Sequence, residues 1–251
     1  MTGTVAIVLA AGKGTRMQSD RPKVMCEALG RPLVEYVLDA IFDAGIERAL
    51  LVVGFRAELV REALAGRENV EFVEQSPQRG TGHAVMMCRD QLAGHHGPVL
   101  VLAGDSPLVQ SRSIKRLLDE YQGRHPACVL GTLHNPNPTG LGRIVRDGKG
   151  NFLGIVEEKD ASPEQRRITE VNMSTYMFDC RELLHALDQL KDDNRQREYY
   201  LTDCPGILKA EAKEVLALSV LQPCEALSVN TVEELRIVEA EMQKLGYPCT
   251  N

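Results

Sequence analysis

The sequence predicts an α/β fold in which helices flank both faces of a mixed, mainly parallel β-sheet. Short, continuously apolar runs recur along the first half of the chain, and amphipathic helical patterns separate them. Continuous apolar strands that alternate with helices are typical of a parallel sheet buried on both faces. Ligands bind beyond the carboxyl ends of the strands in such sheets, so we expect a site in the loops that follow them.

The expected elements of the first half alternate regularly. The predicted strands are the apolar runs at 4–10, 49–54, 70–74 and 98–104. The predicted helices are 32–45, 57–66 and 82–94. The first helix places Leu33, Val37 and Ile41 on one face, and all three helices end at a glycine, a common helix terminator.

The second half of the chain is richer in strands. Its predicted elements are a hairpin at 142–158 that turns at 147–150, a strand at 171–179, a helix within 197–212, a strand at 215–221 and a helix at 231–246. We expect one domain, 1–251, with a first lobe at about 1–135, a strand-rich second lobe at about 136–230 and the C-terminal helix.

Composition and charge narrow the class of protein. The 251-residue chain has a net charge of −6 and a pI of about 5.6, which argues against a broad nucleic-acid interface. Its seven cysteines are scattered without a C-x-x-C pair, so we expect buried thiols rather than a zinc site or a disulfide framework. No signal-peptide pattern or membrane-length apolar run is present, so the expected location is the cytoplasm, with no membrane partner. The oligomeric state stays open.

The loop after the first predicted strand combines glycine with positive charge. Residues 9–25, LAAGKGTRMQSDRPKVM, contain Gly12 and Gly14 and then Arg16 and Lys23. Glycine lets successive backbone N–H groups turn toward an anion, and the two cations add donors suited to phosphate. The pattern favours a triphosphate-binding loop; the alternative is a plain glycine-rich turn with solvated cations.

Single residues exclude two familiar nucleotide motifs. A P-loop needs a glycine where Ile7 stands, and Gly14 rather than Ser or Thr follows Lys13. A dinucleotide fingerprint needs a glycine where Met17 stands, and the stretch 80–85 fails likewise at Val85. A nicotinamide-dependent oxidoreductase is therefore disfavoured.

The loop resembles the signature of sugar-1-phosphate nucleotidyltransferases, and it is most similar to the uridyltransferase (pyrophosphorylase) domain of bacterial N-acetylglucosamine-1-phosphate uridyltransferases. Further blocks match in the same order: QRGTGHAV (78–85), LAGDSPL (102–108), PTGLGRIVR (138–146), GIVEEKDA (154–161), EVN (170–172), EYYLTD (198–203) and SVNT (228–231). The resemblance implies a Rossmann-like fold of the nucleotide-diphospho-sugar transferase type, with the nucleotide in the first lobe and the sugar in the second.

The resemblance also implies roles for individual residues. Arg16 and Lys23 would be the catalytic cations that engage the phosphates. The implied nucleotide-binding residues are Leu9, Ala11, Gly12, Gly14, Thr15, Gln78, Gly80, Thr81 and Asp105. Gln78 would read the uracil edge, because an amide both donates and accepts. His83 lies in the same block, and we interpret it as supporting the loop rather than as catalytic.

The expected cofactor is Mg²⁺. Asp105 follows an apolar strand in GDSPL (104–108), where a carboxylate is well placed to hold this ion; the alternative is a turn or helix cap. The resemblance implies Asp105 and Asn230 as the metal ligands. Asn230 precedes a predicted helix, where Asn is also common as a plain cap.

The second lobe would hold the sugar. The implied sugar-binding residues are Gly142, Glu157, Asn172 and Lys159. Glu157 can accept hydrogen bonds from sugar hydroxyls, and Asn172 can both donate and accept. Lys159 would pair with the sugar phosphate, or instead with Glu157 or Glu158.

The chain departs from the family pattern at several places. Met173 and Ser174 follow Asn172 where Thr and Gly are common, so we expect a different wall near the sugar's 2-substituent. Ala103 stands where an aromatic residue often precedes the GD pair, and Leu141 replaces the usual Tyr. The chain lacks the hexapeptide repeats of a C-terminal left-handed β-helix, so we expect no acetyltransferase activity.

The leading prediction is Mg²⁺-dependent transfer of UMP from UTP to N-acetylglucosamine-1-phosphate, giving UDP-N-acetylglucosamine and pyrophosphate. The alternatives are the same reaction on glucose-1-phosphate or another sugar 1-phosphate with UTP or dTTP, and a non-catalytic sugar-nucleotide sensor on the same fold. The presence of Arg16, Lys23, Asp105 and Asn230 favours an enzyme whose partners are UTP and a sugar 1-phosphate.

Overall fold

The structure, a computed structural model, describes residues 3–17 and 20–249. Its strands are β1 (Val5–Ala10), β2 (Glu27–Ala28), β3 (Arg31–Pro32), β4 (Arg48–Val53), β5 (Val70–Glu74), β6 (Pro98–Ala103), β7 (Cys128–His134), β8 (Gly142–Arg146), β9 (Phe152–Val156), β10 (Glu170–Asp179) and β11 (Val215–Leu218). Its helices are α1 (Leu33–Asp43), α2 (Ala57–Ala63), α3 (Thr81–Met86), α4 (Arg89–Leu92), α5 (Ser111–Arg124), α6 (Cys180–Gln189), α7 (Cys204–Ala210) and α8 (Val232–Lys244).

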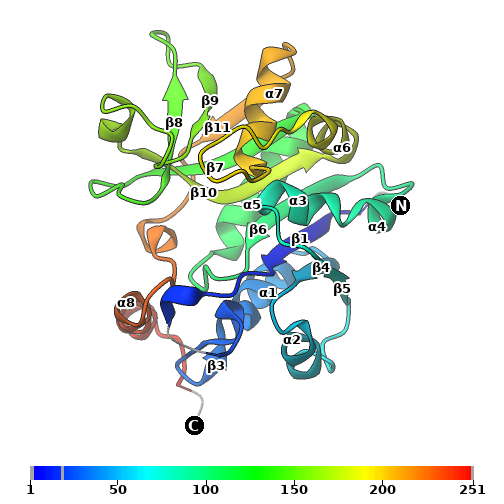
Figure 1. Ribbon diagram of the computed structural model, residues 1–251, viewed down its shortest axis with the longest axis vertical. Helices are drawn as coiled ribbons and strands as arrows, with labels where there is room; N and C mark the ends of the chain where they lie inside the picture. Colours follow the sequence, from blue (N-terminus) through cyan, green and yellow to red (C-terminus); the bar gives the residue numbers. More distant parts are fainter. Residues whose placement is uncertain (1–2, 18–19, 250–251) are drawn as a thin grey trace.

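A large mixed sheet dominates the described part of the chain. Its strands follow the order β11–β7–β10–β6–β1–β4–β5, with β8 paired to β10 and β9 paired to β8 (Figure 1). β1 runs parallel to β4 and β6, and β4 runs parallel to β5, whereas β10 runs antiparallel to β6 and β7. The predicted mixed, mainly parallel sheet flanked by helices is confirmed.

Two hydrophobic layers cover the two faces of this sheet. Successive strand residues alternate between them, so that Val8 and Leu51 pack under α1, α2 and α5. Ile7 and Leu50 face the other side and pack under α3, α4, α6 and α7. Because both faces are buried, the strands read as continuous apolar runs in the sequence.

The prediction of one continuous helix over 82–94 is wrong. The structure divides this segment into two short helices, α3 and α4. The chain tightens at Cys88, whose N–H donates to the Val85 carbonyl three residues back at 3.0 Å. The Cys88 side chain is fully buried in the core. The break therefore places a buried side chain between the two short helices.

Five strands and helices of the described chain lie outside the predicted set: β2, β3, α5, β7 and α6. The two helices nevertheless carry a signal in the sequence. α5 buries Ile114, Leu117 and Tyr121 at helical spacing. α6 begins after Asp179, whose carboxylate accepts hydrogen bonds from two backbone N–H groups of the first turn. β11 is also shorter than predicted, because it ends at Leu218 rather than at 221.

Helix α8 brings the C-terminal part of the chain back to the first loop. Val238 and Met242 are buried in a cluster with Leu29 and Leu33. The Glu239 carboxylate also accepts a hydrogen bond from the Leu29 N–H at 3.0 Å. The segment that precedes α8 is thereby held next to the glycine-rich loop.

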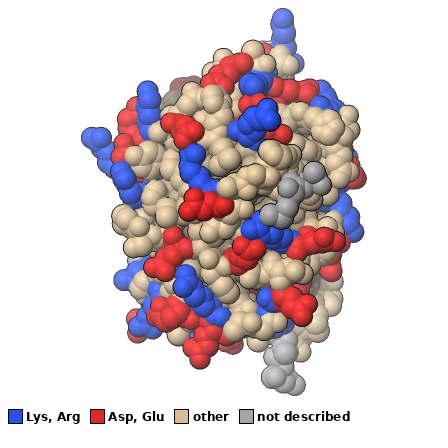
Figure 2. All heavy atoms as spheres, turned by 90° about the vertical axis from the view of Figure 1, so that its right-hand side faces the viewer, with Lys and Arg blue, Asp and Glu red and all other residues tan. Residues whose placement is uncertain are grey.

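The surface mixes charges of both signs. On the face shown in Figure 2, Lys and Arg side chains alternate with Asp and Glu, and no broad patch of one sign forms there. The described helices all fall short of the length and apolar composition needed to cross a bilayer. Five of the seven cysteines are buried free thiols, which agrees with the predicted role of most of them.

Candidate active site

A cavity of about 400 Å³ opens at the carboxyl ends of β1 and β6. The predicted site residues that line it are Leu9, Ala11, Gly12, Lys23, Gln78, Gly80, Thr81 and Asp105. The other lining residues are Val24, Gln75, Ala84, Ala103, Ser174 and Glu198. The structure thus brings together segments that lie far apart in the sequence, at the edge of the sheet where a ligand was expected.

The glycine-rich loop packs directly on Lys23. Gly14 has a φ of +65°, and a Cβ placed on it would lie 2.8 Å from the Lys23 Cβ, closer than real atoms approach. The Lys23 N–H also donates to the Gly12 carbonyl, at 3.4 Å. Glycine at position 14 is therefore needed for the turn that positions Lys23. Thr15 begins a single 3-10 turn that ends at Met17.

Lys23, Asp105 and Asn230 form a polar cluster at the mouth of the cavity. The Lys23 ammonium forms an ion pair with Asp105 Oδ2 and donates to Asn230 Oδ1 at 2.6 Å. Arg16 Nη2 donates to the same Asn230 oxygen at 3.2 Å. The two predicted catalytic cations and the two predicted metal ligands are therefore in contact, although they come from three distant parts of the chain.

Backbone contacts explain why Asn230 reaches this cluster. The N–H of Val229 donates to the carbonyl of Asp105 at 3.3 Å, which fixes one segment against the other. Thr231 caps α8 in a capping box with Glu234, whose carboxylate also accepts from the Asn230 N–H at 2.6 Å. The N-cap of α8 is thus Thr231, and the side chain of Asn230, the residue before it, contacts Lys23 and Arg16. The role of Asn230 as a metal ligand stays a prediction.

The donor set of this cluster fits Mg²⁺. Asp105 and Asn230 offer a carboxylate and an amide oxygen, and Mg²⁺ is commonly held by one or two protein oxygens plus phosphate and water. The Lys23 ammonium already lies against both oxygens, so the pair accommodates a cation. Among residues 3–17 and 20–249, no group of three or more His, Cys, Asp or Glu side chains is placed to hold a metal ion.

The opposite wall of the cavity carries two glutamine amides. Gln78 donates through Nε2 to the carbonyl of Ala11, at the end of β1. Gln75, a residue that the sequence prediction missed, is 5% exposed and donates to the Gly80 carbonyl at 2.9 Å and to Nδ1 of His83 at 3.1 Å. Its place directly after β5 was the available signal, because that is also a carboxyl end of a parallel strand.

His83 supports this wall rather than lining the cavity. Besides its contact with Gln75, its ring lies 6.5 Å from that of Tyr199. Burial, assisted by nearby Arg79, lowers the pKa of His83, which favours the neutral ring that accepts from Gln75. These contacts agree with the predicted supporting role.

The segment 198–203 closes against the same wall. Gly80 has a φ of +103°, and a Cβ placed there would lie 2.6 Å from the Tyr199 carbonyl. The Tyr199 N–H donates to the Arg79 carbonyl at 2.9 Å, and the Thr81 hydroxyl accepts from the Leu201 N–H at 3.1 Å. This close backbone contact places Glu198 at the cavity, another residue that the sequence prediction did not select.

The predicted sugar-binding residues lie on β8 and β10 and in the segment that follows β9, and none of them lines the cavity of about 400 Å³. Gly142 is paired with Asn172 across β8 and β10. Burial raises the pKa of Glu157, which follows β9, although the nearby Thr202 hydroxyl acts in the opposite direction. Lys159 donates to Gln196 rather than to Glu157 or Glu158. Glu158 is instead paired with the buried Arg143.

Arg16 and Asn230 also line a neighbouring cavity of about 630 Å³. Thr139 and Gly140 of the loop before β8 form another part of its wall, and Ile237 of α8 lies opposite. The polar cluster therefore stands between two hollows, with the nucleotide-type residues on one side and the loop before β8 on the other.

Asp203 gives this region a pH dependence. Burial, together with the negative charges of Glu157, Asp193 and Asp160, raises the pKa of Asp203 from 3.8 to about 6. The folded protein therefore binds a proton more tightly than the unfolded chain. The resulting stabilisation is present below about pH 4 and is lost as the pH rises through 6.

We expect Asp203→Asn to raise the melting temperature at pH 8, because it removes a buried charge that the folded state holds poorly. The difference from the unchanged protein should shrink as the pH falls through 6 toward 4, because Asp203 becomes protonated in the folded state. Thermal unfolding followed by circular dichroism across this range measures it. Asp90→Asn, on the exposed side of α4, is the matched control; an equal pH profile for both variants would contradict the assignment.

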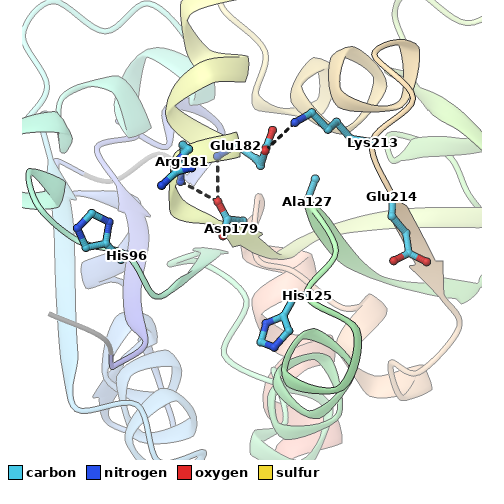
Figure 3. Close-up of a pocket in the computed structure, with 8 residues that line it drawn as sticks. All are labelled: His96, His125, Ala127, Asp179, Arg181, Glu182, Lys213 and Glu214. Carbon is cyan, nitrogen blue, oxygen red and sulfur yellow. Dashed lines mark hydrogen bonds and ion pairs between the residues drawn. The ribbon is translucent and has the colours of Figure 1, made fainter.

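A further cavity, of about 360 Å³, lies near the amino ends of β6, β7 and β11, away from the first cavity (Figure 3). Asp179 there pairs in register with Pro98, the first residue of β6. Its carboxylate caps α6 and accepts from the Tyr121 hydroxyl at 3.0 Å, and Glu182 pairs with Lys213 at 2.8 Å. These side chains are engaged in structural contacts. None of the described residues that line this cavity is a predicted site residue.

Comparison with curated proteins places the chain among longer relatives. It is 41% identical over 244 residues to the bifunctional protein GlmU of Shouchella clausii, and 42% identical over 239 residues to that of Streptococcus gordonii. The alignments cover 97% and 95% of this chain but 53% and 52% of those proteins. The chain therefore spans about half the length of these relatives.

Solved structures share the fold. A UDP-glucose pyrophosphorylase with UDP-glucose bound superposes with a TM-score of 0.78 at 17% identity, covering 98% of this chain and 100% of that one. An apo UDP-glucose pyrophosphorylase gives 0.76 at 16% identity, covering 98% and 99%. The predicted nucleotide-diphospho-sugar transferase type of fold is confirmed. Residues 6–204 match the model of the MobA-like NTP transferase domain, and the protein therefore belongs to this family of nucleotidyltransferases.

Proposed function

We propose that this protein transfers UMP from UTP to a sugar 1-phosphate, with N-acetylglucosamine-1-phosphate as the preferred acceptor and Mg²⁺ as the cofactor. The observation that carries the proposal is the contact between Lys23, Asp105 and Asn230 at the mouth of a cavity lined by a glycine-rich loop and a glutamine amide. The choice of uridine and of the N-acetylated sugar rests on the ordered motifs along the chain.

The reaction joins two anions and needs no general base. The second pKa of a phosphate monoester lies near 6, so the acceptor phosphate is already ionised at neutral pH. One of its oxygens attacks the α-phosphorus of UTP. The bond from that phosphorus to the bridging oxygen breaks, and the electron pair leaves with pyrophosphate. What the protein must supply is alignment and positive charge.

Lys23 and Arg16 supply that charge in the proposed reaction. The Lys23 ammonium lies against Asp105 and Asn230 before substrate binds, and it turns to the α-phosphate when the triphosphate enters. Arg16, with its fork of N–H donors, faces the departing pyrophosphate. Asp105 and Asn230 would hold Mg²⁺, which when bound neutralises the triphosphate and polarises its phosphoryl oxygens.

Gln78 would recognise the base. Its Nε2 donates to the Ala11 carbonyl, so the amide oxygen remains to accept from the N3–H of uracil. Cytosine has no N–H at that position and would leave the amide oxygen without its donor. The geometry of Gln78 therefore favours uridine or thymidine nucleotides over cytidine nucleotides.

Pyrophosphate release tests this proposal. The purified protein is incubated with Mg²⁺ and UTP, and N-acetylglucosamine-1-phosphate and glucose-1-phosphate are supplied in parallel. We expect turnover with both and a higher kcat/KM for the N-acetylated acceptor. A preference for glucose-1-phosphate would keep the reaction and change the substrate. Tight UTP binding without turnover on either acceptor would instead favour the sensor.

A further inference from the structure

Ser174 adopts a backbone conformation that serine rarely takes. Its φ is +52°, in the left-handed region that favours glycine. It lies in a bulge of β10, where β10 advances from Asn172 to Tyr176 while the paired strand β7 advances only from Thr132 to Leu130. A strained residue of this kind persists when the surrounding structure or a function holds it there.

The bulge places the side chains of Met173 and Ser174 in different environments. Met173 is 8% exposed and packs in an apolar cluster with Leu133, Val171 and Leu221. Ser174 instead lines the cavity that holds Lys23 and Asp105. Of the departures from the family pattern, Ser174 and Ala103 therefore line this cavity, whereas Met173 packs in the apolar cluster.

Polar groups with hydrogen-bonding capacity surround Ser174 on the sugar side. Asn172, a predicted sugar-binding residue, is 5% exposed and accepts from the Ser174 N–H at 3.3 Å. The Tyr176 hydroxyl is buried in the same corner. Burial and the nearby negative charge of Glu157 raise the pKa of Tyr176, whereas hydrogen bonding with the side chains of Asn172 and Ser174 acts in the opposite direction. Asn172, Ser174, Tyr176 and Glu157 therefore form a polar corner beside the cavity, which suits a polar ligand.

We propose that Ser174 is an acceptor-binding residue whose hydroxyl hydrogen-bonds the sugar 1-phosphate and contributes to the choice between acceptors. The proposal rests on the proposed function. Ser174 lines the same cavity as Asp105, beside which the phosphates would meet, and its N–H donates to Asn172, which would face the sugar. A glycine would relieve the backbone strain at this position and would offer no hydroxyl, so the strain is explained by the hydroxyl.

Two substitutions distinguish the effect of the Ser174 hydroxyl from the effect of the backbone strain at this position. Ser174→Ala removes the hydroxyl and keeps a Cβ at positive φ, whereas Ser174→Gly removes the hydroxyl and relieves the strain. Ala212→Gly is the matched control, because Ala212 has a φ of +61° after α7 and does not line the cavity. Steady-state pyrophosphate release is measured with N-acetylglucosamine-1-phosphate and with glucose-1-phosphate, and thermal unfolding is measured in parallel.

We expect both Ser174 variants to raise the KM for the preferred acceptor about 3–10-fold, the effect of one hydrogen bond, and to narrow its advantage in kcat/KM over the other acceptor. The KM for UTP should stay within about twofold in both. Ser174→Gly and Ala212→Gly should raise the melting temperature by about 1–4 °C, and Ser174→Ala should not. Ala212→Gly should leave the kinetics unchanged.

An unchanged acceptor KM and selectivity in Ser174→Ala would overturn the proposal, even if Ser174→Gly differed, because only the backbone would then matter. The activity of the unchanged protein tests the proposed function separately. If the unchanged protein releases pyrophosphate and Ser174→Ala has the same acceptor KM and selectivity, only the proposed role of Ser174 is wrong. If it releases no pyrophosphate with either acceptor, the proposed function fails and the role of Ser174 fails with it.

Discussion

Replacing Asp105 by Asn lowers the kcat of pyrophosphate release by roughly three orders of magnitude. The substitution keeps the size of the side chain and removes the negative charge that faces the Lys23 ammonium and, in the proposed reaction, Mg²⁺. The amide is a far weaker ligand for a dication than the carboxylate. Steady-state rates at saturating UTP and acceptor, measured over a wide range of Mg²⁺ concentrations, give the size of the loss.

A direct metal measurement accompanies the rates. Mn²⁺ binding in the presence of UTP, followed by electron paramagnetic resonance, should weaken strongly in Asp105→Asn. Asp119→Asn, an exposed position on α5, should leave both binding and rate unchanged. A variant at position 105 that kept its rate and its Mn²⁺ affinity would remove Asp105 from the metal site.

Replacing Lys23 by Met has opposite effects on catalysis and on metal binding. We expect kcat to fall by roughly 10²–10³-fold, because the cation that turns to the transferring phosphate is lost. Without nucleotide, however, Mn²⁺ affinity should rise about tenfold, since the ammonium no longer lies against Asp105 and Asn230. A general loss of structure would weaken both quantities together.

The loop supplies a matched control for Lys23. Lys13 belongs to the same loop, and its ammonium lies 5.2 Å from the centre of the Phe55 ring instead of in the polar cluster. Lys13→Met should therefore leave the nucleotide-free Mn²⁺ affinity unchanged and lower the rate far less than Lys23→Met. If Lys23→Met bound Mn²⁺ no better than the unchanged protein, the ammonium would not be competing for the metal position.

The sequence predicted the strands and the nucleotide wall well because both depend on local patterns. The apolar runs of β1, β4, β5 and β6 are unambiguous, and the loops after parallel strands meet at one edge whatever the details of packing. The family resemblance assigned Leu9, Lys23, Gln78 and Asp105 to one site, and all four line the same cavity in the structure.

What the sequence could not predict depends on contacts between distant segments. Without the family resemblance Asn230 would not have been selected, because it reaches the cluster through the Val229–Asp105 backbone contact and the docking of α8, neither of which leaves a local pattern. Ser174 reaches the cavity because β10 bulges, and a bulge shifts which side chain faces which side. Met173 was the more conspicuous residue in the sequence, and the bulge turns it into the core.

The contact between the α8 region and the first loop also affects the order in which parts of the protein fold. Arg16 and Asn230 are 214 positions apart, so the polar cluster closes one of the longest loops that the chain can form. Contacts of such separation form late in folding, because the entropy of loop closure is lost before they stabilise anything. During synthesis the ribosome releases Asn230 long after the β1 loop. A nascent chain can therefore complete the pairing of β1, β4, β5 and β6 while the polar cluster stays incomplete until α8 docks.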